Sequence, residues 1–116
     1  MIRDFPAYRK NLQGLMRSLG QKAPGAMSGF GDLHDKTMGN GALDSKTKEL
    51  IALAIGISAH CDDCIAFHVH EALKHGASQE EIAETIGVAI VMGGGPSLMY
   101  SLHAVEAMEQ FAAEGS

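Results

Sequence analysis

The sequence predicts an all-α protein of about six helices. It contains no Trp, 5% aromatic residues, 14 Gly and 7 Met. This composition favours close packing of helices over a β-sandwich, which is usually rich in aromatic and β-branched side chains. Apolar residues recur at spacings of three and four along most of the chain, as they do on one side of a helix. No segment shows the strict alternation of apolar and polar residues that indicates a strand.

Two helices are expected in the N-terminal third. Apolar residues from Phe5 to Leu19 form one stripe along a helix that should end near Gly20. A second helix should begin at Pro24, because proline fits the first turn of a helix. It should end at the Gly-Asn-Gly turn of residues 39–41.

The third and fourth helices contain the most informative residues. Asp44 can cap a helix whose interior, residues 50–57, is apolar on nearly every side, so we expect it to be buried in the fold or between subunits. A fourth helix should begin around Cys61 and stop at Gly76. The cysteine pair of the sequence would then lie at the start of a central helix.

Ser78 and Glu81 form a capping box that predicts the start of a fifth helix. The Gly-Gly-Gly-Pro run of residues 93–96 should end it, and a last helix should run from about Ser97 towards Ala112. The glycine run lacks the Lys and Ser/Thr of a phosphate-binding loop. We expect it to let two helices approach closely.

Charge and length exclude several classes of protein. Lys plus Arg number 9 and Asp plus Glu 14, giving a net charge of -5, and no basic cluster of a nucleic-acid-binding protein is present. The longest nearly apolar stretches, 51–59 and 86–95, are about half of the roughly 20 residues that a membrane span requires. Charges occupy the first ten residues, where a secretory signal has its apolar run. We expect residues 1–116 to form one cytoplasmic domain.

Cys61, Cys64 and His68 would share one face of a helix, since they are spaced by three and four residues. A thiol becomes a good nucleophile when it ionises, and both an imidazole and a helix N-terminus favour the thiolate. His68 is placed to take the Cys64 proton. The carboxylates of Asp62 and Asp63 oppose ionisation.

Other interpretations of the cysteine pair stay open from the residues alone. The cysteines can be buried and structural. They can also join His68 in a zinc site whose fourth ligand is His60 or a residue of another chain. A c-type haem site is excluded because Ile65, not His, follows Cys64, and a thioredoxin site because no strand precedes the pair. Nothing in the sequence indicates a cofactor.

The stretch Lys-Glu-Leu-Ile-Ala-Leu-Ala at 48–54, which contains Glu49, followed by Cys61, Cys64 and His68, resembles the carboxymuconolactone decarboxylase family. More narrowly, it resembles the AhpD-like alkylhydroperoxidase branch, over roughly residues 24–112. The resemblance implies an AhpD-like helical bundle. It also implies that Cys64 attacks a peroxide, that Cys61 donates a proton and closes a disulfide, and that Glu49 and His68 form a proton relay.

The resemblance further implies a small hydroperoxide substrate and a dithiol reductant, either a protein or a lipoyl-type group. Asp63 stands where the best-studied motif of the branch has a histidine, which bears on the peroxidase rate. The alternatives are a non-catalytic redox sensor or binding module and, below these, a lactone decarboxylase, although lactone decarboxylases of the family generally lack the cysteine pair. A metal site ranks equally low.

Glu49 and Cys61 are twelve residues apart, about 18 Å along an uninterrupted helix, so they can meet only if the chain turns back at His60 and Cys61. The remaining histidines are assigned no role and are interpreted as surface or hydrogen-bonded core residues; they are His34, His70, His75 and His103.

The apolar third helix and the Gly-, Ala- and Met-rich fifth helix carry more hydrophobic surface than one small bundle hides. We therefore expect a homo-oligomer in which Ile51, Ile55, Ile90 or Met92 meets a partner subunit. The family resemblance implies trimers or hexamers.

Overall fold

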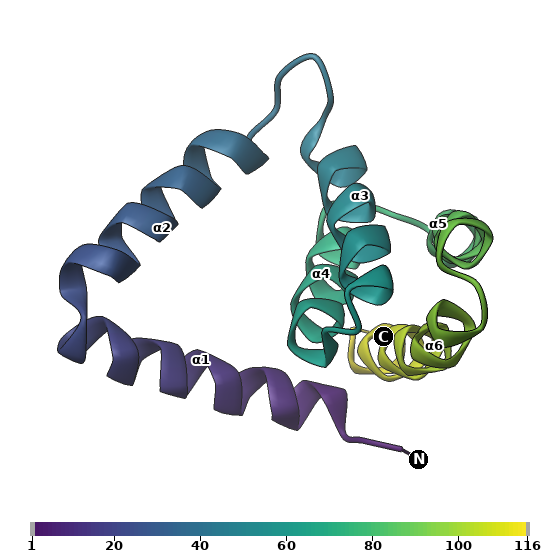
Figure 1. Ribbon diagram of the computed structural model, residues 1–116, viewed down its shortest axis with the longest axis horizontal. Coiled ribbons are helices and arrows are strands. Elements are labelled where there is room, and N and C mark those ends of the chain that lie inside the picture. The colour runs from purple at the N-terminus through teal and green to yellow at the C-terminus, as the bar shows by residue number, and fades with distance from the viewer. Residues whose placement is uncertain (1, 116) are drawn as a thin grey trace.

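The computed structural model describes residues 2–115, which form six helices and no strand (Figure 1). The all-α prediction is confirmed. The helices are α1 (Phe5–Lys22), α2 (Pro24–Met38), α3 (Ser45–Ser58), α4 (Asp62–Lys74), α5 (Gln79–Gly93) and α6 (Gly95–Glu114). None of the helices in the described part of the chain is long and apolar enough to cross a membrane.

The helix ends follow the local chemistry of the sequence. The Asp44 carboxylate accepts a hydrogen bond from the Thr47 N–H at 2.8 Å, and Ser78 and Glu81 form the expected capping box. Some ends differ from expectation by about two residues. The first helix continues beyond Gly20 to Lys22, and the last begins at Gly95 because Pro96 fits its first turn.

The core lies among α3, α4, α5 and α6, with α3 beside α4 and α5 beside α6 (Figure 1). From α1 only Phe5, among the described residues, is buried in this core. The largest apolar side chains that are completely buried in it are Phe5, Leu53, Ile57, Ile65, Ile82 and Val69.

The glycine run between α5 and α6 brings the two helices into close contact, as predicted. A Cβ atom on Gly93 would lie 1.8 Å from the Ser97 Oγ, so no larger residue fits there without displacing that side chain. Gly94 has a φ of +72°, in the region that glycine adopts most readily. The Ser97 hydroxyl also lies 3.4 Å from the Ser58 hydroxyl, which places the end of α3 at the same junction.

The α1 helix leads away from this core, and α2 leads back towards the start of α3 (Figure 1). No described residue of α2 is buried. Phe30 and Leu33 on its apolar side are 65% and 63% exposed. The predicted second helix is therefore present, but Phe30 and Leu33 on its apolar side are not covered by the described part of this chain.

We expect this protein to assemble into a homo-oligomer that covers these side chains. Ile55 and Met92 are 64% and 81% exposed beside an apolar groove of about 430 Å³ between α3 and α5, whereas Ile90 packs against the core. Exposed apolar areas of this kind mark subunit contacts. Light scattering coupled to size exclusion at micromolar concentration should give a mass several times the 12.2 kDa of one chain. A monomer mass would contradict the expectation.

We expect His70 to make the stability of the fold sensitive to acid. Burial, and then the positive charge of Arg9, lower the pKa of His70 below its usual value. The unfolded chain therefore takes up this proton more readily, and the associated stability, present above about pH 6.5, is lost as the pH falls through the lowered pKa. Urea unfolding at pH 8 and pH 5 should show a smaller loss for His70→Gln than for wild type. The exposed His34→Gln control should behave as wild type does.

Candidate functional site

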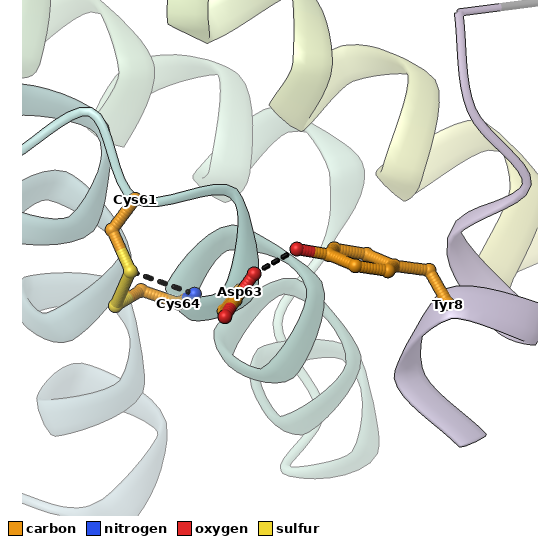
Figure 2. Close-up of a disulfide and its surroundings, with 4 residues drawn as sticks. All are labelled: Tyr8, Cys61, Asp63 and Cys64. Carbon is orange, nitrogen blue, oxygen red and sulfur yellow. Dashed lines mark hydrogen bonds between the residues drawn. A yellow bond between two sulfur atoms is a disulfide. The ribbon is translucent and has the colours of Figure 1, made fainter. Parts of the chain in front are cut away.

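The cysteine pair lies where α3 ends and α4 begins (Figure 2). The chain reverses through His60, a residue with a φ of +57°, which is uncommon outside glycine. The Cys61 N–H donates to the Gly56 carbonyl at 3.0 Å, closing the turn. The predicted reversal at His60 and Cys61 is confirmed.

Cys61 and Cys64 are joined by a disulfide, with their Cα atoms 5.2 Å apart. Cys61 is the N-cap of α4, and its Sγ accepts a hydrogen bond from the Cys64 N–H at 3.1 Å (Figure 2). Both sulfurs therefore lie at the positive end of the α4 dipole. In the reduced protein this location favours a thiolate.

Gly56 on α3 makes room for Cys64. A Cβ atom on Gly56 would lie 2.9 Å from the Cys64 Cβ, closer than real Cβ contacts come. The two helices can thus approach at the level of the disulfide only because residue 56 has no side chain.

Gly56→Ala should therefore destabilise the protein by about 1–3 kcal/mol, the usual cost of overpacking. Urea unfolding of the oxidised protein measures this change. Gly20→Ala is the matched control, because a Cβ at Gly20 meets no atom within 4 Å. That control should be neutral or gain up to about 1 kcal/mol. Equal stability of the two variants would contradict a tight contact between α3 and α4.

Glu49 and His68 form a hydrogen-bonded pair between α3 and α4. The His68 Nδ1 lies 2.8 Å from the Glu49 Oε2. Glu49 is only 3% exposed, although a lone glutamate is normally solvated. His68 lies four residues, about one turn, beyond Cys64 on α4. The fold thus brings Glu49 of α3 to His68 on α4, the helix that begins at the cysteine pair, and the buried carboxylate fixes the imidazole.

The two aspartates between the cysteines have partners that sequence analysis missed. The Tyr8 hydroxyl donates to the Asp63 carboxylate (Figure 2). The His103 Nδ1 lies 2.6 Å from one Asp62 oxygen, and the Arg3 guanidinium lies 3.5 Å from the other. His103, interpreted from sequence as a surface or hydrogen-bonded histidine, is hydrogen-bonded beside the site.

Two other histidines pack against aromatic rings. The His60 ring stacks on Tyr100 with 4.7 Å between ring centroids, and His70 packs edge-on against Phe111. Across residues 2–115, no three His, Cys, Asp or Glu side chains are grouped so that they could hold a metal ion.

Comparison with known proteins places this chain in a family. The family model of the carboxymuconolactone decarboxylase family matches residues 24–107. An uncharacterized protein of Cupriavidus necator is 43% identical over 105 residues, which are 90% of this chain and 93% of that protein.

Two solved structures share the fold. A carboxymuconolactone decarboxylase family protein of Legionella pneumophila is 43% identical with a TM-score of 0.89, over 92% of this chain and 96% of that one. A Thermotoga maritima family protein, whose description suggests involvement in antioxidative response, is 31% identical with a TM-score of 0.80, over 96% and 92% of the two chains. This chain belongs to the carboxymuconolactone decarboxylase family.

Proposed function

We propose that this protein is a thiol-dependent peroxidase of the AhpD-like type, which reduces hydroperoxides through a Cys61 and Cys64 thiol-disulfide cycle. The observation that carries the proposal is the disulfide at the N-terminus of α4, the helix that also provides His68 of the Glu49 and His68 pair. The suggested involvement of the Thermotoga maritima relative in antioxidative response supports the proposal.

In the proposed cycle the Cys64 thiolate attacks the terminal peroxide oxygen and breaks the O–O bond. The sulfur becomes a sulfenic acid, and the departing alkoxide takes a proton and leaves as an alcohol. The Cys61 thiol then attacks the Cys64 sulfur, forms the disulfide and releases water. An external dithiol returns two electrons and two protons.

Glu49 and His68 are proposed to move the protons of this cycle. The buried Glu49 carboxylate holds the His68 ring in one orientation at 2.8 Å. An imidazole so held can accept a proton from the thiol and return one to the alkoxide. No cofactor is needed, because the electrons come from the thiols.

Mass spectrometry tests the proposal. The reduced protein, freed of reductant and given one equivalent of hydroperoxide, should lose about 2 Da within the peptide that contains both cysteines. Cys61→Ser should instead gain about 16 Da, because its sulfenic acid has no second thiol to meet. An unchanged mass of the wild-type peptide at neutral pH would refute the proposal.

A redox sensor without turnover is the second candidate, and the two carboxylates beside the cysteines favour it because they oppose thiolate formation. Steady-state assays with a dithiol reductant separate the candidates. Sustained turnover that disappears in Cys64→Ser rules out a purely sensory role, whereas a single oxidation per chain supports it.

A further inference from the structure

The start of α1 reaches across the fold to the segment between the two cysteines. The Tyr8 hydroxyl donates a hydrogen bond to the Asp63 carboxylate, and the Arg3 guanidinium forms an ion pair with Asp62 at 3.5 Å. Figure 2 shows Tyr8 on α1 pointing at Asp63 beside the disulfide. Both carboxylates that oppose thiolate formation thus have a partner from a distant part of the chain.

Tyr8 is held firmly in this position. Its ring packs edge-on against the buried Phe5, with 6.2 Å between ring centroids. The Arg3 guanidinium lies over the Tyr8 ring, 4.4 Å from its centroid. The backbone N–H groups of Ile2 and Arg3 donate to the Glu106 carboxylate of α6 at 2.7–2.9 Å, which anchors the segment. The hydroxyl is therefore presented to Asp63 by packed neighbours.

We propose that Tyr8 is a positioning residue of the redox pair. Its hydroxyl bonds to the Asp63 carboxylate, weakens the repulsion between that carboxylate and the Cys64 thiolate, and so shifts the equilibrium of the disulfide towards its reduced form. The inference rests on the proposed thiol-disulfide function and names a residue that regulates it. Tyr8 acts through Asp63 and has no part in the attack on peroxide.

The charge balance of the site gives the direction of the effect. Reduction adds two electrons and two protons to the disulfide, and ionisation of Cys64 then places a negative charge next to Asp63 in sequence. A carboxylate that accepts a hydrogen bond repels that thiolate less than one that does not. The charged and titratable groups around the pair come from the N-terminal segment, α1, α3, the turn before α4, α4 and α6; they include Arg3, Tyr8, Glu49, His60, Asp62, Asp63, His68 and His103.

Tyr8→Phe removes the hydroxyl and keeps the ring, so it tests this step directly. The equilibrium between the protein disulfide and dithiothreitol should shift towards the disulfide by about threefold, equivalent to about 14 mV. The pH midpoint of Cys64 alkylation, followed in Cys61→Ser, should move upward when Tyr8→Phe is added. Because Asp63 is exposed, the shift should shrink between about 0.05 M and 1 M salt.

Two further variants test whether the Tyr8 hydroxyl acts through Asp63. Tyr100→Phe removes the same atom from the other tyrosine of the chain, whose ring stacks on His60, and should leave the equilibrium unchanged. In an Asp63→Asn background, Tyr8→Phe should have no further effect, since the charge on which it acts is gone.

The proposal is overturned if Tyr8→Phe leaves both the equilibrium and the alkylation midpoint unchanged, or if its effect persists in the Asp63→Asn background. Neither measurement uses peroxide. A wild-type protein that fails to react with hydroperoxide would refute the proposed function and leave the coupling of Tyr8 to the disulfide measurable.

Discussion

Replacing Cys64 by serine is expected to lower peroxide turnover by about a thousandfold or more, to the rate of the free reductant. A serine hydroxyl does not ionise near neutral pH and cannot form a sulfenic acid, so neither half of the cycle occurs. Consumption of hydroperoxide with a dithiol reductant measures the loss.

Cys61→Ser is the matched control for this prediction, because it removes the other sulfur and keeps the attacking one. It should consume one equivalent of peroxide per chain and then stop or slow, since the sulfenic acid has no internal thiol to condense with. Full turnover in Cys64→Ser would show that Cys64 does not attack the peroxide.

Glu49→Gln is expected to lower turnover by about a hundredfold, which is the lower end of what a positioned proton-transfer group contributes. Glutamine has nearly the same shape and can still bond to His68, but it carries no charge to stabilise the imidazolium. Since Glu49 is 3% exposed and 2.8 Å from His68, solvent cannot readily replace it.

Glu84→Gln, an exposed change of the same chemistry on α5, should stay within about twofold of wild type. If Glu49 and His68 act as one unit, the Glu49→Gln, His68→Ala double variant should be little worse than His68→Ala alone. Fully additive losses would show that the two residues act separately.

The helix ends and the chain reversal were predictable because they depend on neighbouring residues. Asp44, Ser78 and Glu81 cap the helices that follow them, and the turn at His60 was required for α3 and α4 to lie side by side. The hydrogen bond between Glu49 and His68 agrees with the pairing that the family resemblance implied. Capping residues and the family resemblance were therefore sufficient to predict these features of the fold and of the site.

The partners of Asp62 and Asp63 were not predictable in this way. Tyr8 and Asp63 are 55 positions apart, and Asp62 and His103 are 41 apart. Periodicity and capping rules describe contacts within one helix and do not say which helices cross. The sequence therefore indicates the two carboxylate charges that oppose thiolate formation. It does not indicate the hydroxyl, imidazole and guanidinium groups that bind these carboxylates.

The sulfur of Cys61 is both a redox centre and the cap of α4, and thermodynamic reciprocity follows from this double role. Any change in how well the sulfur accepts the Cys64 N–H on reduction alters the stability of the first turn of the helix. A change that stabilises this turn more in one oxidation state than in the other must, by the same factor, shift the redox equilibrium. We therefore expect the hydrogen-exchange rate of the Cys64 backbone amide to differ between the oxidised and the reduced protein.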